Sequence, residues 1–365
     1  MRKVYLQGRS LISALGADLE QALVKLVAGG VAPQRVHLPG GTDWPCYTIQ
    51  RSGCEFETSW RERAQQLIRS AAAEAGVTEE LARNPEVPLF VASSSLDIGA
   101  IENNSGSIGN SYDFAEQIAG WLNWHGPVYL VSSACTSSLQ ALLAAHRIIA
   151  SGAADDAVVL GIELPNRFSI SGFASLQLLT PDRPKPLGAD RDGIALGEAV
   201  AVLRLNNSPA RWRLCGGSNI VDGRDPTGAV PETVARMCAL ALSDSGLNAG
   251  DIDLVKLQAA GSQANDANEL NGMAAAFGTM PPLVTLKSAI GHTLGASGAA
   301  EIALLTACLE TGIWPKPDYP LDPELAYQLV LNNPSAARYI LADILGFGGG
   351  HAAVILEDTN AVEGK

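Results

Sequence analysis

The chain has 365 residues, enough for two compact domains or one large duplicated one, so it can bury a substantial core without disulfides or metals. Hydrophobic residues make up 47% of it and charged ones 17%, with 37 glycines and 20 prolines, which is typical of a turn-rich globular α/β protein and excludes a disordered chain. The formal net charge of −13 argues against a nucleic-acid partner, because phosphate binding needs clustered Lys and Arg.

The first half of the sequence alternates strand-like and helix-like segments. β-branched and aromatic content or continuous apolar runs predict strands, and apolar residues near helical spacing predict helices. Strands are expected within 2–8, 87–95, 127–135, 155–163 and 198–205, and helices within 17–30 and 136–152.

The second half repeats this alternation. Strands are expected within 210–220 and 252–261, helices within 231–246, 265–278 and 295–312, and two apolar segments joined by a glycine loop within 339–358. Strands that alternate with helices favour a largely parallel sheet with helices on its faces. The similar order of strands and helices in the two halves suggests a duplicated architecture, with one half spanning residues 1–207 and the other 208–365.

Cysteine usage and the N-terminal sequence bear on compartment and metal content. No pair of cysteines has the close spacing of a structural zinc site, so we expect no metal. Residues 1–20 lack the features of a signal peptide, and no later segment offers about 18 consecutive apolar residues. We therefore expect a cytoplasmic, reduced protein with no membrane span. The six cysteines are Cys46, Cys54, Cys135, Cys215, Cys238 and Cys308.

One cysteine has a setting that the other five lack. Cys135 falls where the strand of "PVYLVSSAC" meets the helix of "TSSLQALLAAH". A helix N-terminus favours the thiolate, so we expect the pKa of this thiol to be lowered. Cys135 is thus a candidate nucleophile for thioester exchange, although a small buried residue with no chemical role fits the local pattern as well.

A histidine and a lysine share the segment "TLKSAIGHTLGASGAAE". A neutral imidazole at His292 could donate a hydrogen bond to a thioester carbonyl, and the ammonium of Lys287 could fix its tautomer or charge. His37, His125 and His146 have no such context, and His146 lies on the apolar face of a predicted helix, as a core residue would.

The glycine loop "GFGGGH" (346–351) permits positive φ and close backbone approach. Such a loop could bind phosphate or present a backbone N–H as an oxyanion-hole donor. It is flanked by strand-like segments on both sides, which disfavours a dinucleotide fingerprint and favours the oxyanion role.

Taken in order, "SSACTSS", "RPKPLGADRDGIALGEA", "LQAAGS", "KSAIGHTLGASGAAE" and "GFGGGHA" resemble the β-ketoacyl-acyl-carrier-protein synthases, the condensing enzymes of fatty acid and polyketide synthesis. The resemblance covers nearly the whole chain. It implies the thiolase fold, with two similar halves in a five-layer α-β-α-β-α arrangement, and assembly as dimers. It also implies substrates carried on the phosphopantetheine of an acyl carrier protein, and no bound cofactor.

Carried over residue by residue, the resemblance implies roles for seven positions. Cys135 matches the acyl-accepting nucleophile, and Lys287 and His292 match the K-S-x-x-G-H motif. Glu301 matches the acidic residue that buttresses the site. Phe347 matches the residue whose backbone N–H joins that of Cys135 in the oxyanion hole. Asp192 and Gly193 match a structural R-D-G turn.

Three departures from the family pattern stand out. Where the family reads approximately N-A-H-G-T, residues 258–262 read Q-A-A-G-S, so its first catalytic histidine falls on Ala260. The loop that follows is about two residues short before Asp266 and Glu269. Where the family reads G-F-G-G-T-N, the last two places are Gly350 and His351.

These departures leave three hypotheses. The favoured one is a chain-length-factor-like partner in a heterodimer with a complete ketosynthase, in an aryl-polyene-type or related pathway, because Ala260 cannot help stabilise an enolate. The second is a working synthase in which His351 assumes part of the lost role. The third is an acyltransferase that uses Cys135 and His292 without condensation. In each case the negative charge predicts that a local basic patch or a second subunit docks the acidic carrier protein.

Overall fold

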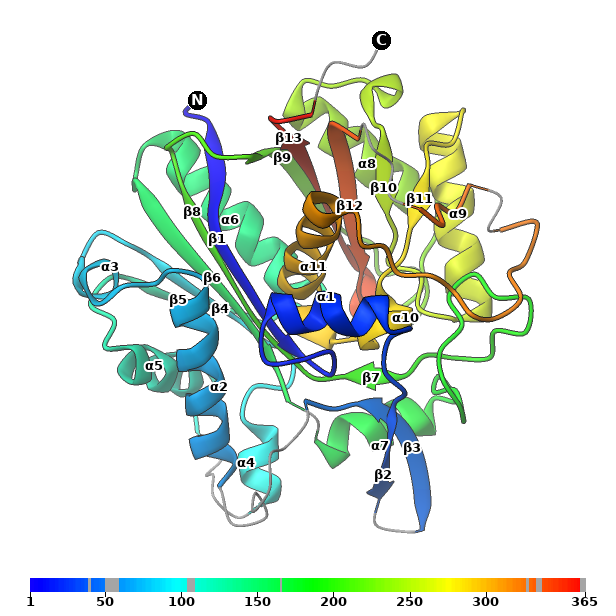
Figure 1. The fold of residues 1–365 in the computed structure, drawn as a ribbon, viewed down its shortest axis with the longest axis horizontal. Helices are drawn as coiled ribbons and strands as arrows, with labels where there is room; N and C mark the ends of the chain where they lie inside the picture. Colours follow the sequence, from blue (N-terminus) through cyan, green and yellow to red (C-terminus); the bar gives the residue numbers. More distant parts are fainter. Residues whose placement is uncertain are drawn as a thin grey trace.

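Ten strands pair into one mixed sheet in the computed structural model of the chain, which describes residues 1–38, 41–49, 59–103, 109–164, 166–325, 328–332 and 337–361. Five strands come from the first half of the chain: β1 (Val4–Ser13), β4 (Leu89–Ala92), β5 (Val128–Val131), β6 (Asp156–Glu163) and β8 (Ala199–Asn206). Five come from the second half: β9 (Trp212–Val221), β10 (Leu254–Lys256), β11 (Leu283–Val284), β12 (Tyr339–Leu345) and β13 (Gly350–Asp358). Their order is β11-β10-β12-β13-β9-β1-β8-β6-β4-β5 (Figure 1).

The two halves of the sheet repeat one topology. β1, β8 and β6 are antiparallel neighbours, and β6, β4 and β5 run parallel. β9, β13 and β12 are likewise antiparallel, and β12, β10 and β11 parallel. The halves join through a short antiparallel pairing of β1 with β9. The similar order of strands and helices that the sequence shows in its two halves therefore corresponds to a duplicated structural unit.

Helices form three layers around the two halves of the sheet, which are called half-sheets below: β1, β4, β5, β6 and β8 form the first, and β9 to β13 form the second. α6 (Ser137–Ser151) and α11 (Ser297–Thr311) lie between the half-sheets, α2 (Trp60–Glu74) and α5 (Ser111–Leu122) cover the first, and α8 (Pro231–Ser245) and α9 (Gln263–Phe277) cover the second (Figure 1). The three largest clusters of buried apolar residues, one central and two outer, match these layers. The expected five-layer α-β-α-β-α thiolase fold is confirmed.

The remaining elements are short. A second sheet has the order β2-β3-β7, with β2 (Gln34–Leu38), β3 (Thr42–Tyr47) and β7 (Leu196–Gly197). The other helices are α1 (Leu19–Val27), α3 (Glu79–Arg83), α4 (Ile98–Glu102), α7 (Arg167–Ser175), α10 (Lys287–Ile290), η1 (Ala249–Asp251), η2 (Leu294–Ala296) and η3 (Phe347–Gly349).

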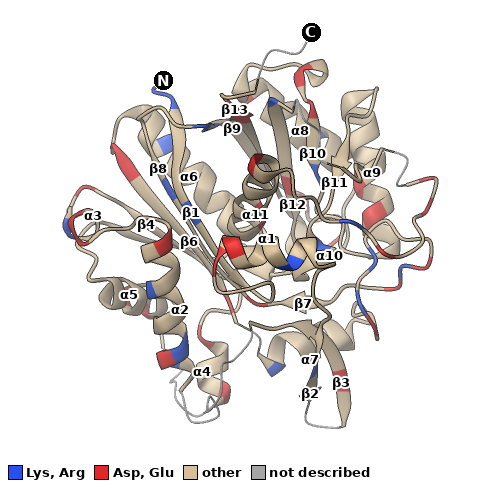
Figure 2. Cartoon of the chain, viewed as in Figure 1, with Lys and Arg blue, Asp and Glu red and all other residues tan. Residues whose placement is uncertain are grey.

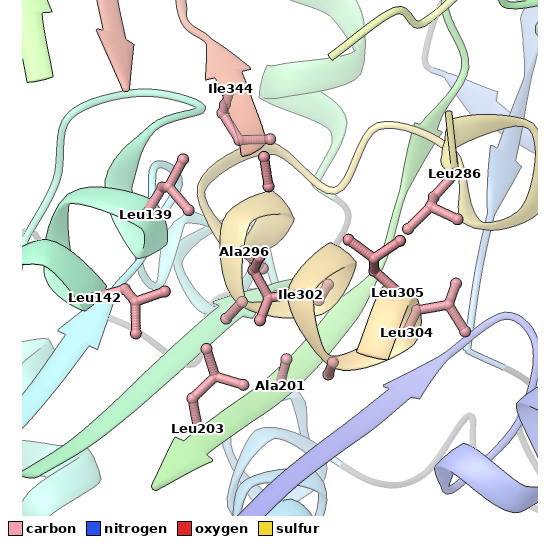
Figure 3. Close-up of a cluster of buried hydrophobic side chains, with 14 of the residues drawn as sticks. Leu139, Leu142, Ala201, Leu203, Leu286, Ala296, Ile302, Leu304, Leu305 and Ile344 are labelled. Carbon is pink, nitrogen blue, oxygen red and sulfur yellow. The ribbon is translucent and has the colours of Figure 1, made fainter. Parts of the chain in front are cut away.

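The central layer is tightly packed because small residues let α6 and α11 approach each other. A Cβ added at Gly298 would lie 2.6 Å from the backbone nitrogen of Leu139, and the N–H of Ala299 donates to Ser138 Oγ at 3.0 Å. Leucines of α6, Ile302 and the leucines of α11, and Leu203 of β8 fill the space around this contact (Figure 3). This packing fixes the N-terminal ends of both central helices side by side.

Charged side chains of both signs are spread over the outer helices and loops (Figure 2). Within the ranges described above, no helix is long and apolar enough to cross a membrane. A few charged residues are buried instead, among them Lys256, Lys287, Glu301 and Asp343. They gather at the N-terminal ends of the central helices, where the candidate site lies.

Candidate active site

Cys135 lies in a strained turn between β5 and α6. Ala134, the residue before it, has a positive φ of 52°, which a residue with a side chain rarely adopts. Ser137 braces the turn, since its Oγ accepts from the N–H of Ser133 at 2.9 Å and donates to the carbonyl of Ala134 at 2.6 Å. The turn places the thiol immediately before the first turn of a central helix.

Burial controls the ionisation of this thiol. Cys135 is buried, and desolvation raises its pKa to about 11, against the opposing effects of the Phe347 N–H and the Lys287 ammonium. The lowered pKa that the sequence analysis expected is therefore wrong. The helix N-terminus is present, but its partial charge does not offset the loss of water around the sulfur.

The glycine loop brings a backbone donor to the sulfur. The N–H groups of Phe347 and of Cys135 itself both favour the thiolate. The loop needs glycine at Gly349, which has a φ of 76° and where an added Cβ would lie 1.6 Å from the carbonyl oxygen of Asp222. The Phe347 ring stacks on Phe173 with centroids 5.2 Å apart. This geometry suits a two-donor oxyanion hole.

His292 is held as a neutral imidazole with a defined tautomer. Burial lowers its pKa well below the usual value, and the nearby Lys287 and Lys256 ammonium groups lower it further. The backbone N–H of Leu294 donates to His292 Nδ1 at 3.2 Å, so Nδ1 is an acceptor and the proton of the neutral ring is on Nε2. His292 Nε2 lies 3.3 Å from the side-chain amide of Gln258.

Two lysines form ion pairs with the same buried glutamate, Glu301, next to the site. Lys287 Nζ forms a short ion pair with Glu301, and Lys256 Nζ contacts the other oxygen of Glu301 at 2.6 Å and the Asp343 carbonyl at 2.6 Å. All of these side chains are buried. Burial is the largest effect on the pKa of Lys287 and lowers it. The cluster places a second cation, Lys256, near His292.

The segment around Ala260 is fixed by its backbone. Asp266 accepts from the N–H groups of Leu187 at 3.0 Å and of Ala260 and Gly261, each at 3.1 Å. The N–H of Gly193, in the R-D-G turn, donates to the Gly261 carbonyl at 3.0 Å. Ala260 is buried and presents only a methyl group.

The segment around Ala260, the histidine loop and the glycine loop line one pocket, whose empty volume of about 550 Å³ includes part of the open solvent, whereas Cys135 and Lys287 are not among its lining residues. Gln258, Ala260, His292, Phe347 and His351 all line it. His351 comes from β13, is buried, and has no hydrogen-bond partner for Nδ1 among the described residues. Burial lowers the pKa of its imidazole. The pocket thus joins the histidine loop to the glycine loop, and the backbone N–H of Phe347 links the glycine loop to the Cys135 thiol.

Sequence reasoning missed several polar residues of the site. Lys256 and Asp343 each interrupt an apolar strand, and a charge within a buried strand is a signal that could have found them. Glu163 ends β6 and accepts from Ser93, Ser94 and Ser95, the serine run that follows β4. Gln258 gave no local signal, because its contact with His292 joins residues far apart in the sequence.

Within the described residues, no group of three or more His, Cys, Asp or Glu is placed to hold a metal ion. Cys46, Cys135, Cys215, Cys238 and Cys308 are free thiols, and Cys54 lies outside the described residues.

Comparisons with known proteins place this site in a family. Residues 62–209 match the model of the β-ketoacyl synthase N-terminal domain, and residues 217–317 match that of the C-terminal domain. The chain belongs to the β-ketoacyl synthase family. The two matched segments carry the ketosynthase thiol turn and the K-S-x-x-G-H loop, respectively.

Curated ketosynthases are similar to the chain over different lengths. A 3-oxoacyl-[acyl-carrier-protein] synthase 2 from Mycobacterium tuberculosis is 33% identical over 248 residues, which cover 61% of this chain and 59% of that relative. The chain thus matches just under three fifths of the mycobacterial protein's length. A protein of the same name from Rhizobium meliloti is 27% identical over an alignment of 420 positions, covering 98% of this chain and 99% of the relative.

Solved structures agree with the fold. A ketosynthase (ApeO) in complex with its chain length factor (ApeC) from Xenorhabdus doucetiae gives a TM-score of 0.84 at 26% identity, over 98% of both chains. A β-ketoacyl synthase from Burkholderia phymatum gives a TM-score of 0.83 at 24% identity, over 99% of this chain and 100% of that one. The latter likeness supports the fold alone.

Proposed function

We propose that the chain is a chain-length-factor-like subunit, which pairs with a complete ketosynthase and shapes the elongation of acyl chains carried on the phosphopantetheine of an acyl carrier protein. An aryl-polyene-type or related polyketide pathway is the expected setting. The similarity to a ketosynthase that is solved with its chain length factor supports this class of assembly.

The observation that carries the proposal is the absence of a hydrogen-bond donor at Ala260. Decarboxylation of a malonyl thioester places negative charge on the thioester oxygen, and preorganised donors stabilise that charge. Losing one such donor costs on the order of 100–1,000-fold in rate. Ala260 supplies only a methyl group to the pocket, and the high pKa of the Cys135 thiol further limits reaction at neutral pH.

The sheet leaves one edge open for a partner. At the β11 edge, the N–H of Leu283 donates to the Gln328 carbonyl at 2.9 Å, and the N–H of Val330 donates to the Leu283 carbonyl at 2.8 Å. At the opposite edge β5 pairs only with β4 among the described strands, and Tyr129 is 44% exposed. An open edge strand is a template for pairing with another chain.

Coexpression with complete ketosynthases tests the proposal. We expect stable copurification with one of them, condensation by the pair, and little condensation by this chain alone. Ala260→His is expected to raise condensation by the isolated chain, since it restores a donor at the pocket wall. A pure homodimer of the wild-type chain that condenses at the rate of ordinary synthases would refute the proposal.

A second candidate function, a self-sufficient synthase, is favoured by one observation. His351 is a buried neutral imidazole whose Nδ1 has no hydrogen-bond partner in the part of the chain that the structure describes, and it lines the same pocket as Ala260. If His351 supplies the missing donor, His351→Ala abolishes condensation by the isolated chain and leaves acyl loading on Cys135 intact, as intact-protein mass shows. Acyl transfer to a second acceptor without release of carbon dioxide would instead identify an acyltransferase.

A further inference from the structure

The only N–H of the His292 ring points at a protein side chain. Because Nδ1 accepts from the Leu294 N–H, a neutral His292 has a single donor, Nε2–H. That nitrogen lies 3.3 Å from the Gln258 amide, and both side chains are buried. A donor that is engaged within the protein is withheld from a substrate unless the substrate displaces its partner.

The orientation of the Gln258 amide follows from the tautomer. With the amide nitrogen toward His292, two donors would face each other, and the amide oxygen would be buried without a partner. Rotating the amide by half a turn places its oxygen against Nε2–H and removes the conflict between the two donors. Gln258 then accepts the one hydrogen bond that His292 can donate.

We propose that Gln258 is a positioning residue that withholds the His292 donor from thioesters in the pocket, so that the chain lacks both imidazole donors and not only the one lost at Ala260. The inference rests on the proposed function. It explains how the chain can retain His292 and the thiol and still be a poor decarboxylase. Gln258 and His292 line the pocket next to Ala260, where a thioester carbonyl would bind.

The reaction used as the readout is the decarboxylation of a malonyl thioester. The bond from the α-carbon to the carboxylate breaks, carbon dioxide leaves, and the electron pair moves through the α-carbon into the thioester carbonyl as an enolate. The enolate carbon then takes a proton from solvent and gives an acetyl thioester. Nε2–H of His292, once free, stabilises the enolate oxygen.

The experiment measures carbon dioxide release from malonyl-N-acetylcysteamine by the isolated chain. Gln258→Ala is expected to raise the rate by about tenfold or more, because one donor is worth on the order of 100–1,000-fold. The rise should be absent from Gln258→Glu, whose oxygen still accepts from Nε2–H, and lost again in Gln258→Ala/His292→Ala. Gln117→Ala, on the outer helix α5, is the matched glutamine control.

Two results would overturn the inference. A rate that stays level or falls in Gln258→Ala would mean that the amide does not block His292, and a fall would identify the amide itself as a donor to substrate. In wild-type protein, ¹⁵N NMR of the histidine rings should show His292 protonated on Nε2, and protonation on Nδ1 would contradict the argument even if the variants fail to fold. Copurification with a complete synthase does not depend on Gln258, so failure there is a separate outcome.

Discussion

At the scale of single residues, desolvation outweighs the helix terminus at Cys135. The pKa of about 11 lies well above the ordinary thiol value of 9.0. This difference means that burial destabilises the thiolate by about 3 kcal/mol relative to the thiol. The partial positive charge at a helix N-terminus typically stabilises an anion by about 0.3–1 kcal/mol.

The high pKa predicts how Cys135 reacts with an alkylating reagent. The thiolate is the reactive form, so alkylation by iodoacetamide should rise about tenfold per pH unit between pH 7 and pH 9, in proportion to the thiolate fraction expected for a pKa of about 11. Peptide mass mapping assigns the adduct, with Cys135→Ser as the control. A rate that levels off below pH 8 would show an activated thiol and contradict this account.

A second residue-scale prediction concerns the Asp266 carboxyl. Burial raises its pKa from 3.8 to about 6, although three backbone N–H groups oppose the shift. Because the folded pKa lies above the unfolded one, the contribution of Asp266 to stability is complete below about pH 4 and is lost as the pH rises through about 6, by about 3 kcal/mol.

Denaturant unfolding at pH 4, 5, 6 and 7 tests whether the free energy of unfolding falls as the pH rises. Asp266→Asn removes the titrating group, so the wild type should lose stability relative to the variant as the pH rises. Parallel profiles for the two proteins would show that Asp266 does not titrate in this range.

The sequence predicted the positions of Cys135, His292 and Phe347 near one another, through the resemblance of their motifs. It did not predict what surrounds them. Lys256 forms an ion pair with Glu301, and its charge lowers the pKa of His292. Gln258 contacts His292, which lies 34 positions further along the chain. Such contacts depend on tertiary packing, which no local pattern encodes.

At the scale of elements, apolar content separated the predicted segments from the missed ones. The buried helix α11 and the strands β6 and β8 have long apolar runs and were predicted. α2 was not: its buried residues lie on one face, but they are Trp60, Ile68 and alanines amid charged residues, so its overall apolar content is low. Its start does carry a signal, the capping box of Ser59 and Glu62.

The central layer should be the most sensitive element to loss of volume. Leu305 of α11 is fully buried between the half-sheets. Leu305→Ala should lower the free energy of unfolding by about 2–5 kcal/mol, because it removes apolar contacts and leaves a cavity. Leu240→Ala on α8, where the side chain is 41% exposed, should change it by less than about 0.5 kcal/mol. Equal effects in denaturant unfolding would contradict the layer assignment.

At the scale of the whole molecule, duplication assembles the site. Each half contributes one central helix, and the chemistry lies where these helices begin: Cys135 before α6, and His292 before α11. The glycine loop sits at the β12–β13 connection, the counterpart of the β6–β8 connection of the first half. Neither half therefore holds a complete site.

The open β5 edge predicts how the chain meets its partner. The carbonyls of Pro127 and Val131 accept from β4, so the alternation of a parallel ladder points the N–H groups of Val128 and Leu130 away from it. Leu130→Pro removes an outward N–H that a partner strand would use, without removing a bond to β4.

We expect Leu130→Pro to weaken association with the copurifying ketosynthase by at least about tenfold in Kd, which corresponds to about 1.4 kcal/mol, as measured by analytical ultracentrifugation. Leu130→Ala is the matched control, because it loses the same side chain but keeps the N–H, and it should bind more tightly than the proline variant. If the two variants bind equally well, the partner does not extend the sheet through β5 and must dock on another face of the molecule.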